Sequence, residues 1–227
     1  MDTLRAPCAS FSTMPIELLI IGSAGLAKET AQLARQIDSL NKRWHRISYV
    51  VEKACELGTV MPYGEVRYTD SQLAGIDCPV DVAIGIGYPK SRRRIAQWLA
   101  ANPSFRFPNL VHPSVEIDSE HVAMGRGNMI CKGVVLTCDI VIGNFNVLNW
   151  NVTVGHDTRI DSFCVVNPGS NVSGNVHIRD ECFLGTGCQV LEGLAIEAAT
   201  VVGAGAVVVH SIESPGTYVG IPARMVT

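Results

Sequence analysis

Six histidines are the side chains in this sequence best suited to moving protons near neutral pH, and one of them has a distinctive neighbour. His156 stands in the triplet Gly155-His156-Asp157, so a carboxylate directly follows the imidazole. Such a carboxylate can fix the tautomer of the ring and raise its basicity, as a general base requires. A lone histidine is more often an exposed polar residue at a corner of the fold, and this alternative stays open. The same exposed role is our prediction for the others: His45, His112, His121, His177 and His210.

Glycine-rich segments are the second feature with chemical potential. The segment from Gly22 to Gly25 follows an apolar run and precedes a helical pattern, and backbone N–H groups at such a turn can hold a phosphate. The full G-x-G-x-x-G fingerprint is absent, so a turn that only packs a helix against a strand is the alternative. Later glycines, at 185, 187, 203 and 205, suit either the close approach of a ligand or simple corner geometry.

A six-residue repeat dominates the second half of the chain. An aliphatic residue or Met recurs in one register fifteen times, while the column two places on is mostly polar or small: Met124, Ile130, Leu136, Ile142, Leu148, Val154, Ile160, Val166, Val172, Ile178, Leu184, Val190, Ile196, Val202 and Val208. This period predicts a parallel β-helix with three hexads per coil and therefore five coils. Small residues spaced by eighteen should stack on one face: Asn146, Cys164, Cys182 and Thr200. Val111 and Ile117 are out of register by one, which predicts a capping turn with one inserted residue near Ala123.

The first half of the chain alternates strand and helix patterns. We expect strands at 17–21, 47–51 and 80–86 and helices at 27–40 and 90–100, which together predict a small parallel α/β domain of Rossmann-like type. The whole chain then divides as follows: 1–15, an irregular N-terminal extension; 16–108, the Rossmann-like domain; 109–213, the β-helix; 214–227, a C-terminal tail.

Composition excludes several classes of partner. The net charge is −3, which gives no reason to expect a nucleic-acid or membrane partner, and the basic run Arg92 to Arg94 is expected to be a solvated helix face. No apolar run approaches the roughly 20 residues that span a bilayer, and we expect a cytoplasmic protein. The eight cysteines show no C-x-x-C pair, so reduced thiols are expected and a zinc site or disulfide framework is not.

Several motifs together resemble one known family. They are the G-S-A-G-L-A-K-E loop, Gly155-His-Asp157, the segment 167–176, Phe183-Leu-Gly-Thr-Gly187, Val202-Gly-Ala-Gly-Ala-Val207 and Val219-Gly-Ile-Pro-Ala-Arg224. With the hexads they resemble the left-handed β-helix acyltransferases of the hexapeptide-repeat type, in particular the bacterial acetyltransferases of nucleotide-linked amino sugars or sialic acids. The resemblance implies a left-handed coil, acetyl-CoA as co-substrate and a homotrimer with active sites at subunit interfaces.

The resemblance also implies roles for individual residues. His156 would be the general base, Asp157 its partner, and the backbone N–H of Gly174 the donor to the oxyanion. The residues implied for cofactor binding are Val165, Gly185, Thr186, Gly187, Gly203, Ala204, Gly205 and Arg224. Some relatives have a second, cofactor-contacting histidine where this chain has Val165.

The acceptor should lie between the N-terminal domain and His156. The residues implied for substrate binding are Gly22, Ala24, Gly25 and Leu26 around the phosphates and Glu52, Lys53, Ile86 and Gly87 around base and ribose. Family members commonly end the second strand with two acidic residues, whereas this chain has Val51-Glu52, so a nucleotide other than uridine, or a free sugar, is open. Trp150 is expected to pack internally, with a place in the sugar pocket as the alternative.

The expected function is acetyl transfer from acetyl-CoA to an amine, or a hydroxyl, of a sugar, with a nucleotide-linked amino sugar for surface glycan synthesis preferred. Two other classes stay open. One is a non-catalytic trimeric scaffold whose N-terminal domain binds a nucleotide. The other is a γ-type carbonic anhydrase, which needs three histidines on a zinc ion, although His121, His156 and His177 lie at unlike phases of the hexad.

Overall fold

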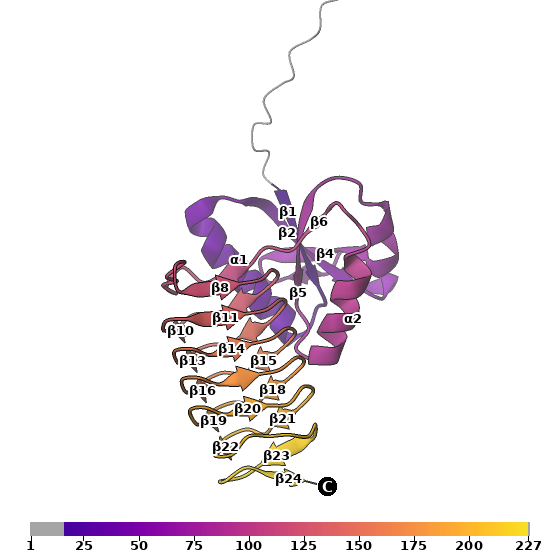
Figure 1. Ribbon diagram of the computed structural model, residues 1–227. Coiled ribbons are helices and arrows are strands. Elements are labelled where there is room, and N and C mark those ends of the chain that lie inside the picture. The colour runs from indigo at the N-terminus through magenta and orange to yellow at the C-terminus, as the bar shows by residue number, and fades with distance from the viewer. Residues whose placement is uncertain (1–15, 227) are drawn as a thin grey trace, which may run out of the picture.

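The computed structural model describes residues 16–226, and the predicted N-terminal extension lies outside them. An α/β part at the N-terminus sits on one end of a long β-helix, which runs away from it toward the C-terminus (Figure 1). The predicted fold class is therefore confirmed for both parts of the chain.

The N-terminal part is a six-stranded sheet with the order β3-β4-β2-β1-β5-β6, parallel except for β3. The order changes direction between β1 and β5, which is the switch point where α/β sheets bind ligands. The elements are β1 (Ile16–Ile21), α1 (Gly25–Asn41), β2 (Trp44–Val51), β3 (Val60–Met61), β4 (Gly64–Thr69), β5 (Val80–Ile84), α2 (Pro89–Leu99), β6 (Phe105–Arg106) and 3-10 turns at Ala54–Glu56 and Asp70–Gly75.

Two details of this sheet differ from the prediction. First, the sequence did not predict strand β4, which lies in the sheet between β2 and the short β3. This strand buries only Val66 and Thr69, too few residues for a clear apolar pattern. Strand β5 ends at Ile84, two residues early, because Gly85 already turns toward α1: a Cβ on Gly85 would lie 2.6 Å from the Cα of Ala27.

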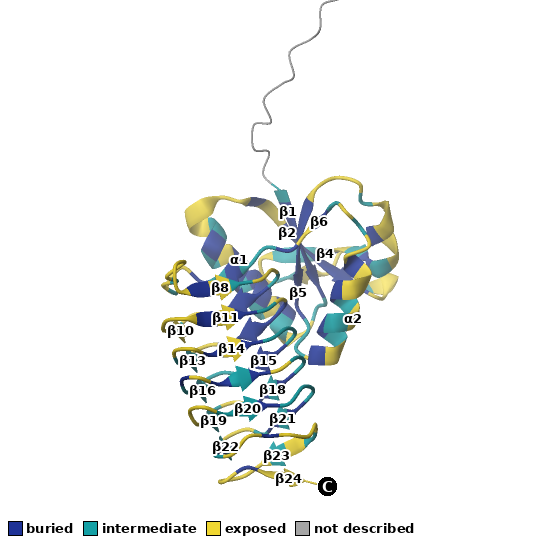
Figure 2. Cartoon of the chain, in the orientation of Figure 1, coloured by how far each residue is buried: buried dark blue, intermediate teal, exposed yellow. Residues whose placement is uncertain are grey.

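The β-helix has a strand at each predicted hexad. Each of the fifteen aliphatic positions is the last residue of one strand from β8 to β22, and all but Met124 and Leu136 are buried. Figure 2 shows this buried interior beside exposed turns. The strands are β7 (Leu110–Val111), β8 (Val122–Met124), β9 (Met129–Ile130), β10 (Val135–Leu136), β11 (Ile140–Ile142), β12 (Val147–Leu148), β13 (Thr153–Val154), β14 (Arg159–Ile160), β15 (Val165–Val166), β16 (Asn171–Val172), β17 (His177–Ile178), β18 (Phe183–Leu184), β19 (Gln189–Val190), β20 (Ala195–Ile196), β21 (Val201–Val202), β22 (Val207–Val208), β23 (Thr217–Val219) and β24 (Arg224–Val226).

Three sheets form the walls of the prism, and all their strands are parallel except β24, which pairs antiparallel with β23. The first wall is β7-β9-β12-β15-β18-β21-β23-β24, the second is β10-β13-β16-β19-β22, and the third is β8-β11-β14-β17-β20. Paired residues are eighteen apart throughout β8 to β22, but Val111 pairs with Ile130, nineteen away, so the predicted one-residue insertion is confirmed. At the other end, β23 continues the first wall and β24 pairs with it, so residues 217–226 add strands where a tail was expected.

A ladder of small polar residues holds successive coils together. The Asn128 side chain accepts from the Asn146 N–H at 2.8 Å, and the Asn146 side chain accepts from the Cys164 N–H at 2.7 Å. Cys182 and Thr200 continue this fully buried column, so the predicted stacking is confirmed. The side chains from Asn128 to Cys182 pair with backbone groups that a corner would otherwise leave unpaired, whereas the hydroxyl of Thr200 has no partner in the described residues.

Helix α2 is joined to the β-helix by two arginines. Arg92 is completely buried and donates to the carbonyls of Ile84, Ile86 and Phe145 at 2.8–3.0 Å, so the prediction of a solvated face is wrong for it. Burial lowers the pKa of Arg92 to about 9. Its neighbour Arg93 pairs with Asp180 of the β-helix at 2.8 Å. The three carbonyls explain why Arg92 can be buried, because they accept hydrogen bonds from its Nε and Nη1, which would otherwise be unpaired.

Candidate active site

His156 lies at the corner between β13 and β14, with 53% of its side chain exposed. Its Nδ1 is 2.8 Å from Oδ2 of Asp157, whose backbone has φ +58°. Since a carboxylate only accepts, Nδ1 carries the proton of this pair and Nε2 is left with a free lone pair. The hydrogen bond to Asp157 raises the pKa of His156, and the charge of Glu192 adds to the shift.

Gly174 occupies the equivalent corner one coil further on. A Cβ on Gly174 would lie 2.5 Å from Nε2 of His156, so only glycine lets the imidazole lie against the backbone here. Within the described residues, the N–H of Gly174 makes no hydrogen bond, while the next N–H, that of Asn175, donates to the carbonyl of His156. The exposed imidazole of His156 therefore lies against buried Gly174, whose N–H has no partner in the described residues.

His121 shows what is particular about this corner. It is equally exposed and pairs with Asp139 at 2.8 Å, and that hydrogen bond raises the pKa of His121. No described glycine would place a Cβ against its ring, whereas Gly174 does so for His156. The histidine–aspartate pair is thus not distinctive by itself, and the adjacent glycine backbone is what sets His156 apart.

Within one chain, the three histidines of the zinc hypothesis, which would have to meet across a subunit interface, are held in separate pairs. His121, His156 and His177 each pair with a different aspartate, and His177 is 3.0 Å from Asp161. Across residues 16–226, no group of three His, Cys, Asp or Glu side chains is arranged to hold a metal ion.

The glycine turns implied for cofactor binding are stacked at another corner of the prism. Gly185, Thr186 and Gly187 follow β18, and Gly203, Ala204 and Gly205 follow β21. The next coil or strand restricts two of these positions, because a Cβ on Gly185 would lie 2.5 Å from the Ala204 N and one on Gly203 2.8 Å from Val219. Gly187 and Gly205 have φ of +70° and +66°. Close packing therefore accounts for Gly185 and Gly203, whereas Gly187 and Gly205 occupy a left-handed position that Asn151 also adopts, with φ +57°, in the same column.

Within one chain, these turns and His156 are not in one place. The turns precede the second wall, β10-β13-β16-β19-β22, and His156 follows it. Arg224 is exposed on β24, at the far end of the first wall. A single chain thus presents the base and the turns on opposite edges of the same wall.

The N-terminal part contains a cavity of about 710 Å³ at the sheet switch point. Five of the residues implied for substrate binding line it: Gly22, Ala24, Glu52, Lys53 and Ile86. Helix α1 begins beside it without a side-chain cap or an acidic residue in its first turn, so its N–H groups are available to an anion.

Sequence reasoning missed other residues of this cavity, among them Asp70, Arg94 and Trp98. Burial and the charge of Glu52 raise the pKa of Asp70. Asp70 directly follows β4, so recognition of that strand would have placed it at the ligand-binding edge of the sheet.

A second cavity, of about 300 Å³, lies between the N-terminal part and the first wall of the β-helix. Leu26 and Gly87 line it together with Val165, which is only 2% exposed. Val165 therefore lies with the residues implied for the substrate and apart from the glycine turns. Gly25 opens α1 and lines none of the cavities described.

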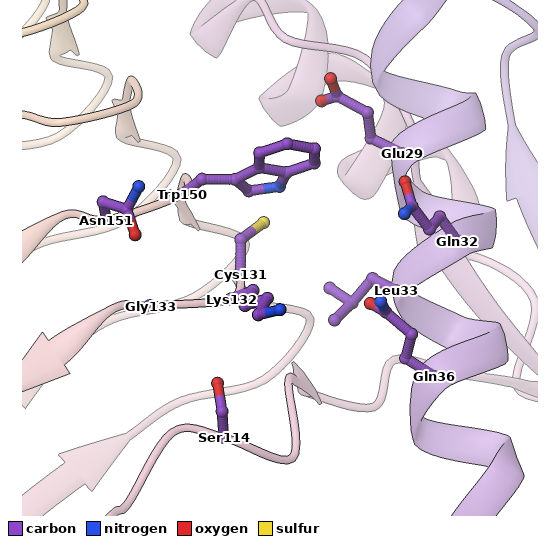
Figure 3. A pocket seen from close by; sticks show the side chains of 10 residues that line it. All are labelled: Glu29, Gln32, Leu33, Gln36, Ser114, Cys131, Lys132, Gly133, Trp150 and Asn151. Atoms are coloured by element: carbon purple, nitrogen blue, oxygen red, sulfur yellow. The ribbon is translucent and has the colours of Figure 1, made fainter.

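A third cavity, of about 420 Å³, lies between α1 and the β-helix (Figure 3). Trp150 lines it and is 42% exposed, so its expected role as internal packing is wrong, and the alternative of a pocket residue fits its position. Glu29 lines both this cavity and the second one.

In residues 16–226, no helix is long and apolar enough to cross a membrane.

Comparison with known proteins finds solved structures of the same fold. No protein-family model and no curated protein matches the chain. Solved structures do match: the acetyltransferase domain of PglB from Neisseria gonorrhoeae is 27% identical, with a TM-score of 0.85 over 92% of this chain and 99% of that one. A perosamine N-acetyltransferase variant from Caulobacter crescentus, in complex with CoA and GDP-perosamine, is 26% identical, with a TM-score of 0.83 over 95% and 99%.

WeeI from Acinetobacter baumannii is 25% identical, with a TM-score of 0.81 over 93% of this chain and all of that one. The whole length of each of these chains is thus reproduced, from the α/β part through the β-helix. The chain thus shares its fold, over nearly its whole length, with hexapeptide-repeat sugar acetyltransferases.

The shared fold gives the β-helix of this chain a left-handed coil. The PglB domain has been solved with acetyl coenzyme A, and the Caulobacter enzyme also as variants with one histidine replaced by asparagine or alanine. The left-handed coil departs from the usual right-handed crossover between parallel strands.

Proposed function

We propose that the protein transfers the acetyl group of acetyl-CoA to the amine of a nucleotide-linked amino sugar, with His156 as general base. The observation that carries the proposal is the corner where the free Nε2 of His156 lies against the backbone of Gly174, whose N–H has no partner in the described residues. The neighbour in complex with CoA and GDP-perosamine supports an amino sugar as acceptor.

The chemistry follows from these groups. The amine lone pair attacks the thioester carbonyl carbon while Nε2 of His156 takes a proton from the amine. The carbonyl oxygen becomes an oxyanion, which the N–H of Gly174 stabilises. When the tetrahedral intermediate collapses, the C–S bond breaks, and the proton passes from His156 to the CoA sulfur. Asp157 holds the ring in the tautomer that leaves Nε2 free.

The division of the site supports a composite assembly. His156 and the glycine turns lie on opposite edges of one wall, and the large cavity lies in the N-terminal part. In a homotrimer, the His156 corner of one subunit would meet the cavities or turns of another. We retain Gly185, Thr186, Gly187, Gly203, Ala204, Gly205 and Arg224 as proposed CoA contacts and the 710 Å³ cavity as the proposed nucleotide site. A role in surface glycan synthesis and a cytoplasmic location stay predictions.

The test is CoA release with acetyl-CoA and a panel of UDP-, GDP- and dTDP-linked amino sugars, with free sialic acid included. We expect turnover with at least one amino sugar and a product heavier by one acetyl group. Turnover only with a hydroxyl acceptor would replace the amine in the proposal. Binding of nucleotides without any turnover would favour the scaffold.

A further inference from the structure

Three cavities follow α1 in sequence. The nucleotide cavity contacts Ala24 just before the helix, the second cavity contacts Leu26 and Glu29, and the third contacts Glu29 through Gln36. Ile86 and Gly87, adjacent in the chain, line the first and the second cavity respectively. The three cavities therefore lie one after another along α1, and we call this row of cavities the track.

The length of the track fits a nucleotide-linked sugar. A diphosphate held by the N–H groups near Gly25 would lie four residues from Glu29, which is about 6 Å along the helix axis. The sugar attached to that diphosphate would then reach the space beside Glu29. The sugar would therefore occupy the two cavities that Glu29 lines.

Glu29 has no ionic partner in this position. It is half-buried and has no hydrogen bond or ion pair within the described residues, although Lys132 lines the same cavity. Its carboxylate oxygens are not buried and face the cavity without a partner, so they are available to a cation from a ligand. An amino sugar brings such a cation, because its amine is protonated until a base removes the proton.

The remaining lining suits a sugar ring. Figure 3 shows the Trp150 indole projecting toward α1, and Glu29 projecting from α1 toward it. An exposed indole offers a flat apolar face for ring C–H groups, and the half-buried amide side chains of Gln32 and Gln36 offer donors and acceptors for hydroxyls. Glu29, Gln32 and Gln36 lie on one stripe of the helix.

We propose that Glu29 binds the ammonium group of the acceptor and that Trp150 supports its sugar ring, so that these two residues make the enzyme select amino sugars over hydroxyl sugars. The inference rests on the proposed function. Glu29 acts on binding, because a carboxylate beside the amine favours the protonated form. The bound ammonium group first loses one proton to water, which gives the neutral amine, and His156 then takes the second proton as the lone pair attacks.

The test compares Glu29→Gln with the wild-type enzyme on the amino sugar that turns over fastest in the panel. We expect the KM for that acceptor to rise roughly 10- to 100-fold, with the KM for acetyl-CoA unchanged and kcat within about threefold. Binding of the nucleoside diphosphate alone should not change. Lys28→Gln is the matched control, because Lys28 is exposed on the same helix and lines none of the three cavities.

A second arm measures selectivity. In the wild type, the amino sugar nucleotide should bind more tightly than its hydroxyl counterpart, and Glu29→Gln should remove most of the difference. Trp150→Ala should weaken both ligands about tenfold, and Trp150→Phe should restore them.

Several outcomes overturn the inference. Unchanged acceptor KM and selectivity in Glu29→Gln would do so, with the proposed function intact. A rise confined to the KM for acetyl-CoA would assign the cavity to the acyl donor. A change of assembly mass in Trp150→Ala would make it an interface between copies. No turnover by the wild type with any acceptor would instead reject the proposed function, and the inference with it.

Discussion

At the scale of the residue, the distinguishing feature of the His156 corner is the close approach of the imidazole to the backbone of Gly174. Exposure and an adjacent aspartate are shared with His121, but only His156 lies against a glycine whose N–H is free in the described residues. The absence of a Cβ at position 174 thus permits this contact.

Replacing Gly174 by alanine tests this arrangement. The new Cβ would overlap the imidazole, which is exposed and can swing aside, so the fold should tolerate the change while Nε2 moves away from the backbone. We expect turnover to fall roughly 100-fold with little change in melting temperature. Wild-type turnover in Gly174→Ala would show that this contact has no role in the reaction.

The pH profile tests the role of Asp157. The base is the neutral imidazole, and because Asp157 raises the pKa of His156, kcat/KM should fall as the pH drops through a value above the ordinary 6.5. In Asp157→Asn, the pKa should return toward its ordinary value, so the acid limb should move to lower pH while the plateau falls. An acid limb at the same pH in both enzymes would contradict this account.

At the scale of the element, Arg92 connects the substrate loop to the β-helix. Its guanidinium bridges Ile84 and Ile86, at the end of β5, to Phe145 on the first coils of the β-helix. Because Ile86 lines the nucleotide cavity, Arg92 positions that cavity relative to the catalytic domain without touching the substrate.

The variant Arg92→Met removes these three hydrogen bonds and leaves buried carbonyls unpaired. We expect a loss of about 3 kcal/mol in the free energy of unfolding and a higher KM for the nucleotide sugar, with the KM for acetyl-CoA unchanged. Chemical denaturation and steady-state kinetics measure the two effects. Lys90→Met, at an exposed position of α2, should change neither, and equal changes in both variants would sink the idea.

The sequence predicted elements best where one side chain repeats one role. Every hexad position became a strand, because each aliphatic meets the same interior, and even the insertion before Met124 was visible as a break in register. Strand β4 and buried Arg92 were not predictable in this way. Both depend on partners distant in the sequence, and a basic triplet carries no sign of which arginine finds three carbonyls.

The same limit applies to the site. Motif resemblance nominated His156, Gly174 and the cavity residues Gly22 and Glu52, but it gave no reason to choose Glu29. From the sequence, a single glutamate on a helix is normally expected to be an exposed surface charge. Only the packing of α1 against the β-helix shows that Glu29 faces two cavities.

At the scale of the whole molecule, the chain leaves apolar surface on the β-helix. Val135 is 52% exposed and Leu191 46%, both at or beside strands of the second wall, and Val141 is 44% exposed on the third. The second wall is also the one that separates His156 from the glycine turns. A neighbouring subunit on these walls would cover the apolar residues and complete the site.

We therefore predict a trimer, with a mass of three times 24.4 kDa in light scattering coupled to size exclusion. Leu191→Lys should weaken the assembly and reduce turnover in parallel, because a charge would be buried where the subunits meet. A fully active monomer would contradict a composite site.

The central claim is that His156 removes the acceptor proton, and the most direct measurement is CoA release by His156→Ala beside His121→Ala. We predict that His156→Ala loses roughly 100-fold or more in turnover while it still binds acetyl-CoA and keeps its assembly mass. His121→Ala, which removes an equally exposed histidine paired with an aspartate, should keep wild-type turnover. Equal turnover in His156→Ala and wild type would contradict the mechanism.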